Sequence, residues 1–369
     1  MSKHHGFANE GGFDYEKWLF SHRIESVGKV VGFQGNRRVS MPIFSVDQTR
    51  KNISDSIQSQ FDQFSTVGLF SALIVGDRSF IASDQWGVLR ATGTSHLFAI
   101  SGLHIGLFAG LFYGLTSWLW RFLVRGSSLV AAPYIASVSG LIAAIMYSAA
   151  AGFSIPTLRA LVMLSVWVIF SLVGRQSRMS DGLLGAAFAV LLVFPRSPLD
   201  PGFWLSFSAV LIIFWALNGR LFWVQRNRKK AKVFRQIVLV QWVVFVGLAP
   251  LLIVLFGQVS LISPLVNMLA VPFVSLFLLP FSLIGIVLLW LWPVVGMWWI
   301  QQTLRVFDVA WQGLEYLEQN LSSAFPFADE GLLCSVLLVL AAILVLAPRA
   351  MPYKWLGLFA FLPDGAFFY

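Results

Sequence analysis

Three polar side chains interrupt an apolar stretch of the sequence, and their types could support catalysis. The segment "SHLFAISGLHIGLFAG" carries His96, Ser101 and His104. Ser101 precedes His104 by one helical turn, a spacing that would let the imidazole serve as base for a serine nucleophile. A serine hydrolase also needs an orienting group for the base and an oxyanion hole, and neither is visible in the sequence. Intramembrane Ser/His hydrolysis is therefore kept only as a minor alternative.

The histidines lack the spacing of a metal site. His96 and His104 are eight positions apart, about 12 Å along a helix, so the i, i+4 ligand spacing is missing. The other three histidines all lie within residues 1–22, and Cys334 is the single cysteine. Zinc usually takes three protein ligands even in an open catalytic site. We predict no metal site, no cofactor and no catalytic residue.

Further polar groups fall within apolar segments, where they are costly and by default mark a functional path. Arg159 is the most costly, because its own segment holds no acidic residue. Its partner is expected to be Asp200, backbone carbonyls or a bound phosphate, with snorkelling to lipid headgroups as the alternative. The residues predicted to line or shape a path are His96, Ser101, Gly102, His104, Pro156, Thr157, Arg159, Asp200, Ser206 and Asn267.

A structural explanation competes with this path hypothesis. Gly102, Gly106 and Gly110 recur every four positions, which predicts a small-residue face where another helix packs closely. In that case the nearby hydroxyl and imidazole groups would only join packed helices.

Composition places these residues in a membrane. Of 369 residues, 57% are hydrophobic and 12% are charged, and the mean hydropathy is +0.76, which excludes an ordinary soluble protein. The predicted fold class is an all-α polytopic membrane protein, a helical bundle of about 8 to 10 transmembrane or re-entrant helices. The predicted spans are 97–119, 130–151, 156–173, 182–194, 202–218, 237–256 and 331–347.

Several other segments are predicted to be helices that do not simply span. Residues 46–64 show helical periodicity and read as an amphipathic helix on a membrane surface or a neighbouring domain. Residues 66–76 form a short apolar helix, and residues 300–321 form an amphipathic interfacial helix. The region 261–292 carries three prolines at intervals of eight, which predicts a broken or kinked helix.

Charge indicates the orientation. Between Ala91 and Phe307, fourteen basic residues stand against two acidic ones, Asp181 and Asp200. The basic clusters satisfy the positive-inside rule if the amino-terminal region is external and the loop 219–236 is cytoplasmic. The same cationic bias would also suit an anionic substrate.

Four segments carry a family resemblance. The motifs "HLFAISGLHIGL", "GFSIPTLRAL", "DPGFWLSFSAVL" and "FGQVSLISPLVNMLAVPFV" occur in this order and together resemble the competence domain of the ComEC family, the inner-membrane channel of bacterial DNA uptake. The resemblance covers roughly residues 50–347. The stretch "NEGGFDYEKWLFSHRI" is similar to part of the family's amino-terminal region, which contains an OB-like domain.

The resemblance implies a channel core that carries single-stranded DNA across the bacterial inner membrane during natural transformation. Family members add leading transmembrane helices and a metallo-β-lactamase-like nuclease domain, so this chain is expected to be truncated at both ends and to lack nuclease activity. The expected parts are a partial OB-like soluble region with β-strands (1–45), amphipathic and short apolar helices (46–90), a transmembrane competence domain (91–350) and a tail (351–369).

The resemblance also implies partners. These are single-stranded DNA, the lipid bilayer, a DNA-receptor protein, a cytoplasmic ATPase or helicase, and a second copy of the chain. The sequence has no Walker-type stretch, so nucleotide energy would come from a partner. A transporter of another anionic solute remains the main alternative function.

Overall fold

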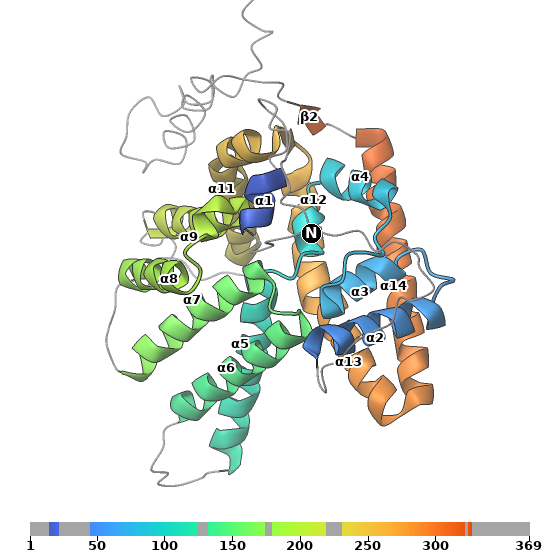
Figure 1. The fold of residues 1–369 in the computed structure, drawn as a ribbon, viewed down its shortest axis with the longest axis horizontal. Helices are drawn as coiled ribbons and strands as arrows, with labels where there is room; N and C mark the ends of the chain where they lie inside the picture. The colour runs from blue at the N-terminus through green and yellow to red at the C-terminus, as the bar shows by residue number, and fades with distance from the viewer. Residues whose placement is uncertain are drawn as a thin grey trace, which may run out of the picture.

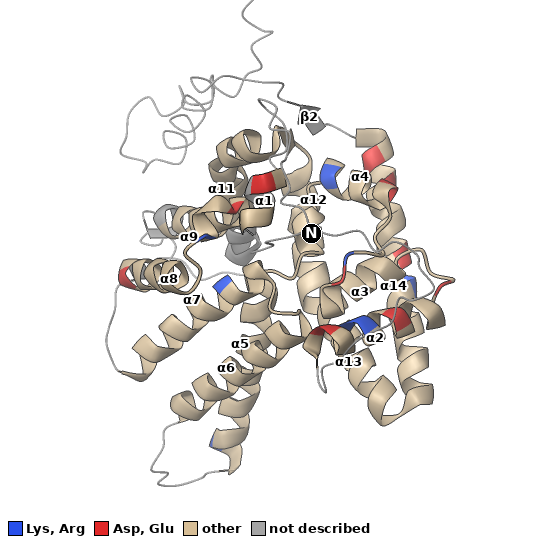
Figure 2. Ribbon diagram, in the orientation of Figure 1, with Lys and Arg blue, Asp and Glu red and all other residues tan. Residues whose placement is uncertain are grey.

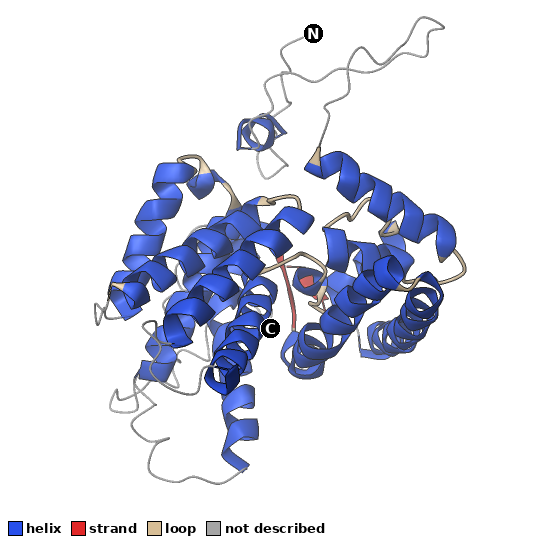
Figure 3. Ribbon diagram, turned by 90° about the horizontal axis from the view of Figure 1, so that it is seen from below, coloured by secondary structure: helices blue, strands red, loops and turns tan. Residues whose placement is uncertain are grey.

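A computed structural model describes residues 15–21, 45–123, 132–173, 179–218, 231–321 and 324–326. The described chain is almost entirely helical, as Figures 1 and 3 show, and this confirms the predicted all-α class. The predicted β-containing region at 1–45 and the predicted span 331–347 lie outside the described residues, apart from the short helix α1, Tyr15–Ser21.

A fully buried short helix forms the centre of one half of the protein. All nine residues of α3, Val67–Val75, are buried, because the helix is apolar on every side and is surrounded by other helices. The amphipathic helix α2, Val46–Gln60, packs on α3 through Ile57. Two helices from the carboxyl-terminal half of the chain, α13 and α14, also pack on α3. The short apolar helix and the amphipathic helix were both predicted, and α2 proves to rest on protein.

Three long apolar helices follow the helix α4, Ser83–Ala91, and a short 3₁₀ turn. They are α5, Gly102–Leu123; α6, Ala132–Ala150; and α7, Ile155–Leu172. α5 and α6 form the most extensive helix pair. A Cβ atom on Gly140 of α6 would come within 2.9 Å of the Ala109 carbonyl oxygen of α5, so the two backbones approach closely at this glycine.

A second group of helices comprises α8, Met179–Val193; α9, Pro201–Asn218; and α11, Ala231–Phe256. α9 packs mainly on α11, while α8 packs mainly on α7. The group is seen beside α7 in Figure 1.

The proline-rich region was predicted to be broken or kinked, and it is not broken, because it forms one continuous helical run. It consists of α12, Ser263–Phe273; a π-helical segment, Val274–Leu278; and α13, Leu279–Leu291. Pro264 lies in the first turn of α12, where no backbone donor is lost. The π segment directly follows Pro272 and ends just before Pro280, so the unusual helical turn lies between the two interior prolines. Helix α14, Pro293–Leu321, then returns along α13. It contains the predicted amphipathic segment but begins seven residues earlier than predicted.

The two short strands of the described chain join distant segments. β1, Gln258–Ser260, pairs antiparallel with β2, Ala324–Pro326. The pair connects the end of α11 to the end of α14, and nothing in the sequence pattern predicted it.

The protein is a multi-pass membrane protein. Within the described ranges, five helical segments are long and apolar enough to cross a bilayer: Gly102–Leu123, Ala132–Ala150, Ile155–Leu172, Val238–Phe256 and Ser263–Leu291. The apolar helices Ser180–Val193 and Pro201–Phe214 are shorter. Figure 2 shows that charged residues gather on α2, α4 and α14, whereas α5 to α9 are almost free of them.

Candidate functional site

The start of α7 carries residues that favour a helix amino terminus. Ser154 occupies the N-cap position, and Pro156 lies within the first two helical residues, where its missing N–H is not needed. The buried Thr157 hydroxyl donates to the Ser154 carbonyl oxygen at 2.7 Å. Pro156 and Thr157, both predicted as path residues, therefore have a clear local role in starting the helix that carries Arg159.

Asp200 caps α9 through its side chain. Its Oδ1 accepts the Gly202 N–H at 3.1 Å, and Pro201 is the first helical residue. Aspartate at the N-cap followed by proline is a favoured way to begin a helix, so "DPGFW" is a helix-start signal as well as a family motif.

These two helix starts meet at a buried ion pair. Arg159 Nη1 donates to Asp200 Oδ2 at 2.5 Å, which confirms the expected pairing. The Arg159 side chain is only 2% exposed, against 24% for Asp200, so the snorkelling alternative is wrong. A Cβ atom on Gly202 would lie 2.7 Å from Arg159 Nη2, and glycine is therefore needed where the guanidinium rests on α9. Arg159 Nε is buried without a hydrogen-bond partner.

His96 and Ser101 precede the first long helix, so the predicted span 97–119 is present but its start was placed five residues too early. His96 lies in the 3₁₀ turn Ser95–Leu97, with Nδ1 3.1 Å from the Gly93 carbonyl oxygen, and its side chain is exposed. Ser101 is the residue before α5, and its carbonyl oxygen accepts the Ile105 N–H.

His104 is fully buried in the first turn of α5, and neither ring nitrogen has a hydrogen-bond partner. The Ser101–His104 pair that a hydrolase would need is therefore not formed, and this alternative is wrong for the described conformation. Within the described residues, no group of three His, Cys, Asp or Glu side chains is placed to hold a metal ion.

Asn267 joins the loop before α5 to α12. Its Nδ2 donates to the Gly93 carbonyl oxygen at 3.3 Å and to Ser263 Oγ at 2.8 Å, while its buried Oδ1 has no partner. Asn267 and His96 thus meet at the same carbonyl oxygen. The structure brings together Arg159 with Asp200, and His96 with Asn267, but it shows no hydrogen bond between these two pairs. Ser206 is half-buried on α9.

Among the described residues, the glycine face of α5 touches another helix only at Gly102, so the close packing predicted for all three glycines is not seen there. Gly102, Gly106 and Gly110 are exposed, and Cβ atoms on Gly106 and Gly110 would meet nothing within 4 Å. On Gly102 a Cβ atom would meet only the Ala160 side chain, at 3.3 Å. The close helix contact is made at Gly140 of α6.

Arg50 of α2 is an important residue that the sequence pattern did not single out. Its Nε donates to the carbonyl oxygens of Val75 and Ala150, both at 3.0 Å, and its Nη2 donates to Val75 at 2.6 Å. These are the last residues of α3 and α6, where helix carbonyls lack internal partners and the dipole favours a cation. Glycines after both helices, Gly76 and Gly152, have positive φ, and such C-terminal glycines were the available signal.

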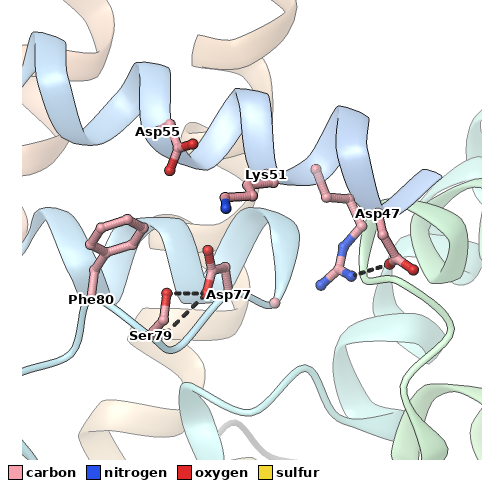
Figure 4. A pocket seen from close by; sticks show the side chains of 8 residues that line it. Asp47, Lys51, Asp55, Asp77, Ser79 and Phe80 are labelled. Atoms are coloured by element: carbon pink, nitrogen blue, oxygen red, sulfur yellow. Dashed lines mark hydrogen bonds and ion pairs between the residues drawn. The ribbon is translucent and has the colours of Figure 1, made fainter. Parts of the chain in front are cut away.

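A charged pocket of about 340 Å³ lies beside Arg50. Lys51 points from α2 into it, toward the loop that carries Asp77 and Ser79 (Figure 4). Partial burial acts to raise the pKa of Asp77, but hydrogen bonds from the Ser79 hydroxyl and N–H and from Ser54, with the attraction of Arg50, hold that pKa below its ordinary value. The pocket lies where α2 meets the end of α3 and the loop that follows it.

Comparison with known proteins decides the family. The sequence profile of the Competence protein family matches residues 73–352. The chain belongs to this family. The match extends over both polar groups described above and over all five candidate spans.

Relatives of this competence-family chain occur in several bacteria. It is 34% identical to "Competence protein ComA" of Neisseria gonorrhoeae over 94% of this chain and 48% of that protein. It is 32% identical to "Recombination protein 2" of Haemophilus influenzae over 75% of this chain and 35% of that protein. It is 30% identical to "ComE operon protein 3" of Bacillus subtilis over 76% of this chain and 34% of that protein. The chain spans about half the length or less of these relatives, and no solved structure matches it.

Proposed function

We propose that this chain is the membrane core of a channel that takes single-stranded DNA across the bacterial inner membrane during natural transformation. The observation that carries the proposal is the family match over residues 73–352. The printed names of the relatives, "Competence protein ComA" and "Recombination protein 2", agree with a role in DNA uptake.

The proposed organisation follows the sequence. Residues 1–45 form a soluble region outside the cell membrane, 46–90 a helical connection, 91–350 the transmembrane competence domain and 351–369 a tail. The basic loop 219–236 faces the cytoplasm, in agreement with the positive-inside rule. A DNA-receptor protein, an ATPase or helicase, and a second copy of the chain are the partners that such a channel would use.

The role proposed for this chain is transport of a polyanion, not catalysis. A polyanion crossing a bilayer needs hydrogen-bond donors and cationic groups along its path. Arg159, His96 and Asn267 supply such groups near the starts of α7, α5 and α12. His104, Ser101 and Gly102 shape the first turn of α5, while Ser206 lies on α9. No step of this role requires a covalent intermediate.

The test is deletion of the gene in its own host, complemented by the wild-type chain or by Arg159→Leu. We expect deletion to abolish transformation, and Arg159→Leu to lower the number of transformants at least about tenfold while membrane abundance stays normal. Asp47→Asn, at an ion pair whose carboxylate is 83% exposed, is the matched control and should complement fully. Normal transformation after deletion would refute the proposal. If the chain then proved to carry another anionic solute, the transporter alternative would take its place.

A further inference from the structure

The junction of α7 and α9 holds more anion-binding capacity than one carboxylate uses. Two helix amino termini meet there, each with a positive dipole end. Arg159 has five N–H donors, of which Nη1 contacts Asp200 and Nε is buried without a partner. The hydroxyl of Ser197, whose carbonyl oxygen accepts the Asp200 N–H, is also buried and unpartnered.

We propose that this junction is an anion-exchange site, in which a phosphodiester group replaces the Asp200 carboxylate on Arg159. The site would take the phosphate groups of the transported strand, and in this respect the inference rests on the proposed function. Exchange forms and breaks only hydrogen bonds and ion contacts, so no covalent step is involved.

Charge and geometry favour exchange at this place. A phosphodiester carries one negative charge, as the carboxylate does, so replacement keeps the buried guanidinium neutralised. Its oxygens can contact two guanidinium nitrogens at once, including the Nε that is free, whereas the present contact engages Nη1 alone. The Gly202 N–H, which now donates to Asp200 Oδ1, points an additional donor at the same place.

The two partners also differ in their freedom to move. The Arg159 side chain is 2% exposed, whereas that of Asp200 is 24% exposed. The carboxylate can therefore turn toward water while the guanidinium stays in place. Because α7 packs on α5, α6 and α8 while α9 packs mainly on α11, exchange would remove the direct ionic link between two groups of helices.

The test uses Asp200→Asn in the purified full chain. Asparagine remains a good N-cap, so α9 keeps its start, while the competing charge is lost and Arg159 is left without a counter-ion. We expect a lower thermal midpoint for this variant in phosphate-free detergent. Inorganic phosphate should then raise the midpoint by about 2 °C or more. It should raise the wild-type midpoint by less, because there the phosphate must first displace the Asp200 carboxylate.

Two controls isolate Arg159. The double variant Arg159→Gln/Asp200→Asn has no buried cation and should not respond to phosphate. Asp47→Asn makes the same change at Arg50, whose Nε and Nη2 already bind helix carbonyls, and should not respond either. A phosphate response in the double variant, or none in Asp200→Asn, would overturn the exchange site.

The source of the phosphodiester is tested separately. A short oligothymidylate should bind Asp200→Asn at least about threefold more tightly than wild type, while its uncharged methylphosphonate analogue should show no such gain. A gain seen only with phosphatidylglycerol in nanodiscs would assign the site to lipid and overturn the DNA assignment. If Asp200→Asn binds phosphate but deletion of the gene leaves transformation normal, the site stands and the proposed function fails. If deletion abolishes transformation but Asp200→Asn shows no phosphate response, the proposed function stands and the exchange site fails.

Discussion

Arg159, the fifth residue of α7, pairs with Asp200, the residue directly before α9 and 41 positions further along the chain. The Arg159 side chain is 2% exposed and the Asp200 side chain 24% exposed. The carboxylate neutralises a buried cation that lies near the amino terminus of α9, where the helix dipole disfavours positive charge.

Loss of the two partners should have unequal effects. Asp200→Asn leaves a buried, unpaired guanidinium and should lower the free energy of unfolding by about 3 to 5 kcal/mol. Arg159→Met leaves a carboxylate that still reaches water and fills the buried volume, and should cost about 1 to 2 kcal/mol. Unfolding in mixed micelles measures both, with the double variant closing a mutant cycle. Equal losses would contradict the difference in burial.

Sequence reasoning succeeded where one physical rule dominates. Burial of a lone cation in an apolar segment demands a counter-charge, and only two acidic residues were available between Ala91 and Phe307, so Asp200 could be named in advance. The helices α2 and α3 were equally predictable. The pattern of α2 fits a helix with one polar, solvent-facing side, and that of α3 fits a helix that is apolar on every side.

Sequence reasoning failed where one local pattern is compatible with two different structures. An apolar run does not reveal that residues 95–97 form a 3₁₀ turn, because hydrophobic periodicity is similar on either side of Ser101. Pro272 was expected to break its helix, but the following π segment accommodates it. A glycine stripe such as Gly106 and Gly110 also cannot tell a packed face from an open one.

Arg50 should be critical for the junction of α2, α3 and α6. Arg50→Met removes donors to two helix carboxyl termini and should lower stability by about 2 to 4 kcal/mol. Arg50→Lys keeps the charge but lacks the planar fork that reaches both Val75 and Ala150, and should recover only part of the loss. Asp47→Ala should have an effect below about 1 kcal/mol. Thermal midpoints in detergent test all three, and a full rescue by lysine would contradict the geometry.

Two glycines should respond in opposite directions to alanine. Gly152 has φ of +68°, and its Cβ atom would lie 1.9 Å from Arg50 Nη1, so Gly152→Ala should cost about 2 to 4 kcal/mol. Gly106 is helical with open space around it, so Gly106→Ala should raise helix stability by about 0.5 to 1 kcal/mol. Midpoints measured side by side decide between this and a packed glycine face, which predicts a loss for both.

The Asp77 carboxylate should make stability depend on pH. Its pKa in the folded protein lies below the ordinary value of 3.8, so its contribution is complete above about pH 5 and is lost as the pH falls through and below about 4. The difference in thermal midpoint between wild type and Asp77→Asn should therefore be largest at neutral pH and shrink toward pH 3. Ser79→Ala, which removes a hydrogen bond to Asp77, should reduce the same pH dependence, and a difference constant with pH would contradict the assignment.

His104 offers a test that separates stability from transport. Both ring nitrogens are buried without partners, so His104→Leu removes unsatisfied polar atoms and should leave the thermal midpoint unchanged or higher, by up to about 2 kcal/mol in free energy. Thr157→Val is the matched control, because that buried hydroxyl is bonded at 2.7 Å and its loss should lower stability by about 1 kcal/mol.

We expect His104→Leu to reduce transformation despite this stability, because a buried and unpartnered imidazole is costly and the proposed path would account for its presence. The comparison is made by counting transformants at matched membrane abundance. A stable His104→Leu protein with normal transformation would remove His104 from the proposed path. A destabilised protein would instead show that the imidazole has a partner that holds the first turn of α5 in place.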